Sequence, residues 1–117
     1  MSQEKKRQEP AIKRRYTRYH IDIRLMATVV REGVTITVHG RCDRLAEGGL
    51  SAVMAGELVP GETAALEFWL PVGPDPLQLR AVVRYRRGFH HGFQFLDPTP
   101  AQRQAIRRHC QGLVPAR

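Results

Sequence analysis

The chain has 117 residues, of which 42% are hydrophobic, and a formal net charge of +8 at pH 7. This length fits one ordinary domain that folds without disulfide bonds, and the positive charge predicts an anionic partner: nucleic acid, a lipid surface or a phosphorylated small molecule. Two separate cysteines, no apolar segment long enough to cross a bilayer and no signal-peptide core together predict a cytoplasmic protein without membrane insertion.

Much of the positive charge lies at the N-terminus, where residues 1–18 hold seven Lys and Arg against two Glu, a net +5. Residues 1–13 have too little apolar content to offset the entropy of ordering, so we expect a flexible basic tail there. Arg14, Arg15 and Arg18 follow, just before the first predicted strand. Guanidinium groups bind phosphate through paired hydrogen bonds and stack on purines, although a run of charge is also typical of a plain solvated face.

From residue 21 to residue 95, apolar and polar side chains mostly alternate, which is the two-residue period of half-buried strands. Turn signals divide this region at Glu32-Gly33, Pro60-Gly61, residues 71–76 and Gly88. We predict strands over residues 21–30, 34–39, 50–54, 64–70, 77–85 and 89–95, with residues 43–49 interrupting the pattern. Six short strands with one apolar face each predict a small all-β barrel or sandwich, and closure into a barrel would remove exposed edges.

The C-terminal segment changes to a helical period. Thr99 can cap a helix, Pro100 suits its first position, and Gln102 can complete a capping box. A stripe of four residues is expected to pack on the strands: Gln102, Ile106, Cys110 and Leu113. Three arginines are expected to stay in solvent: Arg103, Arg107 and Arg108.

No group of residues predicts catalysis or a metal site. His90 and His91 are adjacent on a predicted strand, so their rings point to opposite faces and cannot share one metal ion. Cys42 has no activating partner in its neighbourhood and is expected to be an inert, buried thiol. Asp43 and Glu47 lie in a loop with no arrangement for acid–base chemistry. We therefore expect a binding protein without catalytic residues, metal or cofactor.

Four stretches resemble the PilZ domain family, the bacterial receptor module for cyclic di-GMP. They are RRYTR at 14–18, LAEGGL at 45–50, RAVVRY at 80–85 and HGFQFLDPTPAQRQAIRRH at 91–109, so the likeness covers about residues 14 to 111. The resemblance implies a six-stranded antiparallel β-barrel with a C-terminal α-helix over residues 14–113, after the flexible tail. It also implies that cyclic di-GMP is the ligand, bound without any further cofactor.

The resemblance implies particular ligand-binding residues as well. Arg14 and Arg18 match an RxxxR motif that wraps the phosphates and guanine edges, with Arg15 as a common extra arginine. Gly49 matches the last position of a second motif, (D/N)xSxxG, which grips a guanine from the barrel surface. This sequence departs from that motif at two positions. Arg44 occupies the position of the Asp or Asn, and Ala46 occupies the position of the Ser. The implied ligand-binding set is Arg14, Arg15, Arg18, Arg44, Ala46, Gly48 and Gly49.

The two departures predict weakened binding. An arginine has five donors and no acceptor for the guanine N–H groups, and Ala46 lacks a hydroxyl. A buried ligand donor left unpaired costs about 1–3 kcal/mol, which lowers affinity by about one to two orders of magnitude. Asp43 is an acceptor one residue early, and it restores the motif only if the chain bulges there, because a one-residue slip reverses the face of a strand.

Three functions follow from these observations. The first is a cyclic di-GMP receptor or adaptor of bacterial second-messenger signalling that acts on a downstream protein partner. The second is an adaptor with a degenerate motif, which contacts proteins without binding the nucleotide. The third is a nucleic-acid binder that uses the basic tail and a stacking platform of Phe89, Phe93 and Phe95. The third is disfavoured, because those rings share a face with the expected core.

Overall fold

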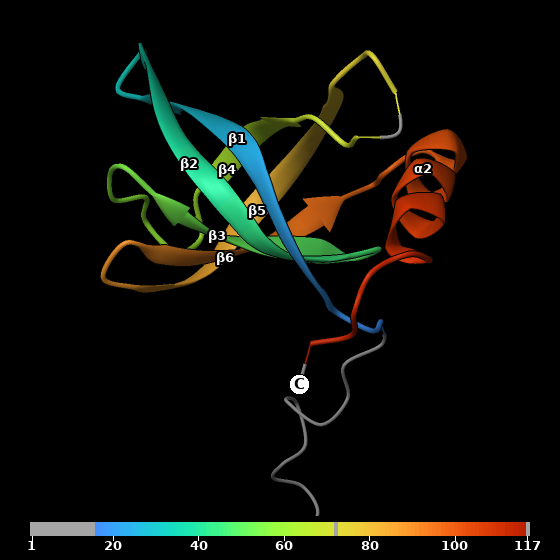
Figure 1. The fold of residues 1–117 in the computed structure, drawn as a ribbon. Coiled ribbons are helices and arrows are strands. Elements are labelled where there is room, and N and C mark those ends of the chain that lie inside the picture. The colour runs from blue at the N-terminus through green and yellow to red at the C-terminus, as the bar shows by residue number, and fades with distance from the viewer. Residues whose placement is uncertain (1–15, 72, 117) are drawn as a thin grey trace, which may run out of the picture.

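A computed structural model describes residues 16–71 and 73–116, which form six strands and one helix (Figure 1). The elements in chain order are β1 (Tyr19–Arg31), β2 (Val34–Ala46), β3 (Gly49–Met54), β4 (Thr63–Phe68), β5 (Leu77–Arg87), β6 (His90–Leu96) and α2 (Pro100–Cys110). The strands form a closed antiparallel barrel in the order β1-β2-β3-β6-β5-β4. The predicted β-barrel with a C-terminal helix is therefore confirmed, and the alternative of a sandwich is wrong.

The barrel interior is filled by the alternating apolar side chains of all six strands, as the two-residue period predicts. Phe93 and Phe95 belong to this core, and the ring of Phe95 stacks on that of Phe68 with centroids 6.2 Å apart. A stacking platform for bases that uses Phe93 and Phe95 is therefore excluded. Phe89 differs from the prediction, because it lies in the turn before β6 and is 52% exposed.

The barrel closes where β1 meets β4, through four residue pairs that join residues 25–28 to residues 65–68. The ladder between β1 and β2 is far longer and extends from Tyr19 to Arg31. Beside the short ladder, the guanidinium of Arg24 lies 5.1 Å from the centroid of the Trp69 ring. A hollow of about 540 Å³ adjoins these two residues.

The expected interruption at residues 43–49 is wrong in extent. β2 continues to Ala46, and the turn to β3 consists of Glu47 and Gly48. The pattern breaks because the ladder bulges: Cys42 faces Ala52 and Arg44 faces Ser51, so that Asp43 has no residue opposite it in the ladder register with β3. A bulge of this kind inserts one residue and changes the direction of the strand.

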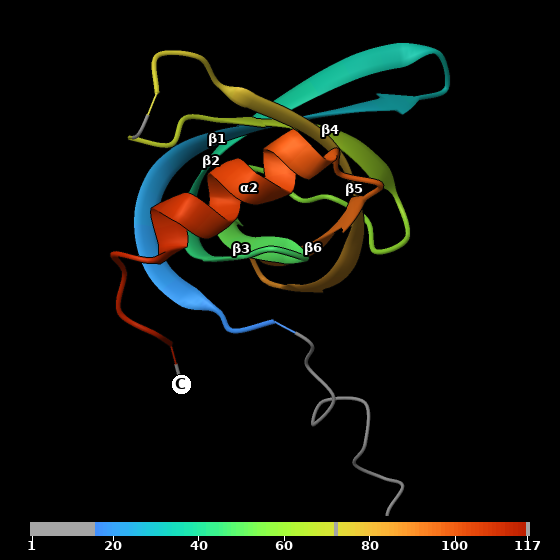
Figure 2. The ribbon, with the colours of Figure 1, turned by 90° about the vertical axis from the view of Figure 1, so that its right-hand side faces the viewer.

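Helix α2 covers one end of the barrel (Figure 2). The predicted start is confirmed, since the Thr99 hydroxyl accepts from the Gln102 backbone N–H and the Gln102 side chain accepts from the Thr99 N–H. Ile106 and Cys110 are buried against the barrel, as the stripe predicts. Within the described residues, no helix has the length and apolar character needed to cross a membrane.

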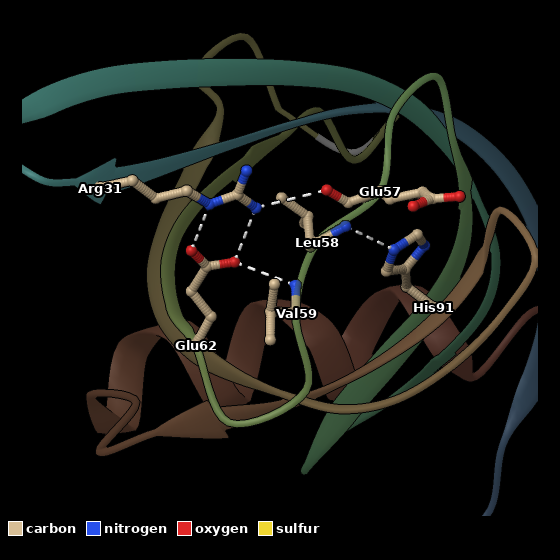
Figure 3. A network of polar contacts seen from close by, with 6 residues as sticks. All are labelled: Arg31, Glu57, Leu58, Val59, Glu62 and His91. Carbon is tan, nitrogen blue, oxygen red and sulfur yellow. Dashed lines mark hydrogen bonds and ion pairs between the residues drawn. The ribbon is translucent and has the colours of Figure 1, made fainter.

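The opposite end of the barrel is closed by the loop between β3 and β4, whose Leu58 side chain is fully buried (Figure 3). The backbone N–H of Leu58 donates to Nε2 of His91 over 3.0 Å. Because this amide can only donate, the proton of the neutral imidazole sits on Nδ1, which donates to the Phe89 carbonyl at 2.8 Å. The buried ring of His91 therefore joins the loop to the start of β6.

An ion pair holds the rest of this loop (Figure 3). Arg31 donates to both carboxylate oxygens of Glu62, at 2.6 and 2.9 Å, and Glu62 also accepts from the backbone N–H of Val59 at 3.0 Å. The hydrogen bond from Arg31 holds the pKa of the Glu62 carboxyl below its usual range. The loop is thus tied to the end of β1 through a charged group.

The lowered pKa of Glu62 predicts a pH dependence of stability. A carboxyl with a lowered folded-state pKa stabilises the fold above its ordinary pKa of about 4.3, and loses that contribution as the pH falls through the lowered value. We expect Glu62→Gln to reduce the free energy of unfolding at pH 6, and the difference from wild type to shrink between pH 5 and pH 3. Urea titrations at these pH values measure it, and a difference that stays constant with pH would contradict the assignment.

Candidate ligand site

The turn between β2 and β3 depends on two glycines. A Cβ atom at Gly48 would lie 2.8 Å from the ring of Tyr16, and one at Gly49 would collide with the carbonyl of Phe93. Since real Cβ atoms do not approach a backbone carbonyl so closely, position 49 requires glycine, whereas a side chain at position 48 would displace the Tyr16 ring. The segment before β1 therefore rests directly on the backbone of this turn.

The residues implied as ligand-binding lie around this turn, as far as the structure describes them. Arg14 and Arg15 lie outside the described residues, whereas Arg18 is partly buried immediately before β1. Tyr19 faces Leu45 and His20 faces Arg44 in the ladder of β1 and β2, so the same register sets Arg18 beside the end of β2. The fold thus brings Arg18 and Arg44 to the same edge as the turn.

Ala46 and Arg44 differ in their surroundings. Ala46 is buried, with 6% of its surface exposed, although it is not part of the hydrophobic core cluster inside the barrel. Arg44 is partly exposed and pairs with Ser51 across the bulge. Of the two departures from the family motif, the arginine is therefore the one with access to a ligand.

The bulge turns a carboxylate outward next to Arg44. Cys42 and Leu45 are both buried, so the two residues between them, Asp43 and Arg44, both face the outside of the barrel. One oxygen of Asp43 accepts from the Ser51 hydroxyl at 2.6 Å, and the other lies 3.1 Å from Nε2 of His90. The condition under which Asp43 could restore an acceptor, a bulge in the chain, is met in this structure.

Helix α2 reaches the turn through two of its arginines. Arg107 donates to both oxygens of Glu47, at 2.9 and 3.1 Å, and this hydrogen bonding lowers the pKa of the Glu47 carboxyl. Arg103 donates to the hydroxyl of Tyr16 at 3.3 Å. Arg107 and Arg108 are exposed, as expected, whereas Arg103 is only partly exposed. The partners of Arg107 and Arg103 were not predicted, because they lie about 60 and 90 residues away in sequence.

The contacts enclose a small hollow beside the turn. It has a volume of about 290 Å³, and its walls include Tyr16, Tyr19, Glu47 and Arg107. Polar groups and aromatic rings thus meet there at the end of the barrel that α2 covers. Such a combination suits a ligand that carries both charge and flat rings.

Both cysteine thiols are buried. Burial raises the pKa of Cys42, whose Sγ lies 3.3 Å from the Arg44 carbonyl, and burial raises the pKa of Cys110 to about 11. Both are therefore protonated at neutral pH and are poor nucleophiles. His90 points outward and His91 inward, and no group of three His, Cys, Asp or Glu in the part of the chain described here could hold a metal ion.

Comparisons with known proteins agree with this architecture. The profile of the PilZ domain matches residues 12–112. The PilZ domain of YcgR from Escherichia coli, solved with c-di-GMP, superposes with a TM-score of 0.66 at 20% identity, over 86% of this chain and 90% of that one. The PilZ domain of CeSA from a cellulose-synthesizing bacterium gives 0.62 at 20% identity, over 81% and 95%.

A longer protein matches in part. The inhibitor of motility MotI/DgrA of Bacillus subtilis superposes with a TM-score of 0.63 at 18% identity, over 84% of this chain. This chain spans only 49% of that protein's length. No curated protein sequence matches this chain. Structural likeness at these identities shows the shared fold.

Proposed function

This chain belongs to the PilZ domain family, and on that premise we propose that it is a receptor for cyclic di-GMP. The observation that carries the proposal is the meeting of the two partial motifs at one edge: Arg18, Arg44 and the glycine turn lie together although the sequence separates them by about 30 residues. We also propose that the protein works in the reducing cytoplasm, because its two cysteines form no disulfide.

In this proposal the arginines bind the phosphates and the guanine faces. Arg14, Arg15 and Arg18 contact the ligand, while Gly48 allows the segment before β1 to pack closely on the turn and Gly49 allows the turn to pack closely on β6. Hydrogen bonds to charged groups contribute about 1.5–3 kcal/mol each, so two or three of them with one stacked purine support roughly micromolar binding.

Asp43 supplies the acceptor that the family motif lacks at Arg44. Guanine presents N–H donors on its Watson–Crick edge, and a carboxylate has lone pairs to spare beyond the two used by Ser51 and His90. Arg44, on the same outer side, then meets guanine O6/N7 or a phosphate, which are acceptors. The site therefore still offers one acceptor, Asp43, and one donor, Arg44, but at positions that differ from those of the family motif.

The second candidate is an adaptor that contacts a protein partner without the nucleotide. It is favoured by the buried methyl of Ala46, which provides no hydroxyl, and by the hydrogen bonds that already occupy Asp43. This candidate predicts that the wild-type chain releases no heat of binding when it is titrated with cyclic di-GMP.

Calorimetric titration with cyclic di-GMP separates the two. We expect wild type to bind at roughly micromolar affinity, and Asp43→Ala to bind about 10 to 100 times more weakly, because a ligand donor left without its acceptor costs about 1–3 kcal/mol. If wild type gives no heat and no rise in melting temperature at tens of micromolar ligand, the receptor function is rejected and the adaptor is supported.

A further inference from the structure

A short segment after α2 pairs with the start of β1. Residues 113–116, here called the strap, lie antiparallel to residues 18–20, with Tyr19 and Pro115 as the paired residues. The backbone N–H of His20 donates to the Val114 carbonyl at 3.1 Å, and the N–H of Ala116 donates to the Arg18 carbonyl at 2.7 Å. Figure 1 shows the described N-terminal and C-terminal segments next to each other.

The sequence explains why the chain turns back here. After α2, the N–H of Leu113 donates to the Cys110 carbonyl, which reverses the chain, and Leu113 then packs against the core. Pro115 faces Tyr19 at the position between the two hydrogen bonds, where a missing N–H costs no ladder bond. The sequence of the strap is therefore compatible with its pairing to β1.

The strap covers an edge that would otherwise be open. β1 pairs with β4 only through residues 25–28, so residues 18–20 have β2 on one side and the strap on the other. The segment before them is fixed as well, because the Tyr16 ring lies against Gly48 and its hydroxyl accepts from Arg103. The base of the arginine motif is thus held by β2, by the strap, by the turn at Gly48 and by α2.

We propose that the strap is a positioning segment for the arginine motif, which holds Arg18 in place beside the end of β2. The proposal rests on the proposed function, since Arg18 is one of its ligand-binding residues. The strap lies beyond residue 112, where the match to the family ends. Holding a binding segment in place before the ligand arrives removes part of the ordering cost from the binding step.

The test uses a chain that lacks residues 114–117 and keeps Leu113 with its core contacts. We expect its affinity for cyclic di-GMP to fall at least fivefold, mainly through faster dissociation. Ala116→Pro, which removes one of the two backbone hydrogen bonds, is expected to cost about two- to threefold. Ala116→Gly keeps the donor and is the matched control, with wild-type affinity.

Amide hydrogen exchange gives a readout that does not need the nucleotide. In the shortened chain the N–H of His20 has lost its acceptor and is expected to exchange faster, while amides in β3 and β6 are unchanged. An unchanged His20 amide, or an unchanged affinity, overturns the proposal. If wild type binds no cyclic di-GMP, the proposed function fails, and the exchange of His20 alone decides whether the strap holds this segment.

Discussion

Replacing Arg18 by alanine is expected to lower the affinity for cyclic di-GMP at least tenfold, and Arg14→Ala is expected to do the same. Each change removes a guanidinium that forms charge-assisted hydrogen bonds to the phosphates, worth about 1.5–3 kcal/mol. Arg18 lies at the base of the motif, immediately before β1 and beside the end of β2, so its loss removes a cation next to the turn between β2 and β3.

Arg108→Ala is the matched control for these variants. It makes the same change in net charge, and Arg108 is exposed on α2 without an ion pair to any described residue. Calorimetry at fixed ionic strength compares the four proteins, because long-range electrostatic effects depend on salt. If Arg14→Ala and Arg18→Ala bind as tightly as Arg108→Ala, these arginines do not hold the ligand.

Replacing His91 by alanine is expected to lower the free energy of unfolding by about 3 to 5 kcal/mol. The change leaves a cavity in the barrel and strips the acceptor from the buried N–H of Leu58, and each of these costs about 1–3 kcal/mol or more. The loop between β3 and β4 would lose its link to β6, so the barrel end opposite α2 should open first.

His90→Ala provides the comparison, since it is the neighbouring residue and differs only in direction. Its ring is 31% exposed and its pair with Asp43 lies near solvent, so its loss should change the free energy of unfolding by less than about 1 kcal/mol. Urea denaturation of both variants at pH 7 measures the difference. Equal destabilisation by the two changes would show that the hydrogen bonds of His91 add nothing.

The fold was predictable wherever a local period dominates. Alternation predicted all six strands, and Thr99, Pro100 and Gln102 predicted the start of α2. The prediction of a loop at residues 43–49 was wrong for a physical reason. A bulge places two outward residues in succession, so the alternation is lost and a bulged strand resembles a loop in the sequence. The opposite error occurred at Phe89. It was assigned to a strand because it continues the alternation of β6, although it lies in the turn before that strand.

The site was predictable only in part, because its parts come from distant segments. The arginines and the glycine turn are visible as motifs, whereas the ion pair of Arg107 with Glu47 joins residues with no local signal. The contact of Asp43 with His90 and Ser51 depends on three strands meeting. The strap carries no sequence signal except Pro115, and a proline shortly after a helix is equally typical of a plain helix end.

The short ladder between β1 and β4 bears on the order in which the barrel assembles. The hairpins β1–β2 and β5–β6 join neighbouring segments across tight turns, whereas β1 and β4 meet only after about 40 intervening residues have been folded back. Their four pairs should therefore form last and separate first. Trp69, the only tryptophan of the sequence, lies beside this junction under Arg24, so its emission reports barrel closure in real time.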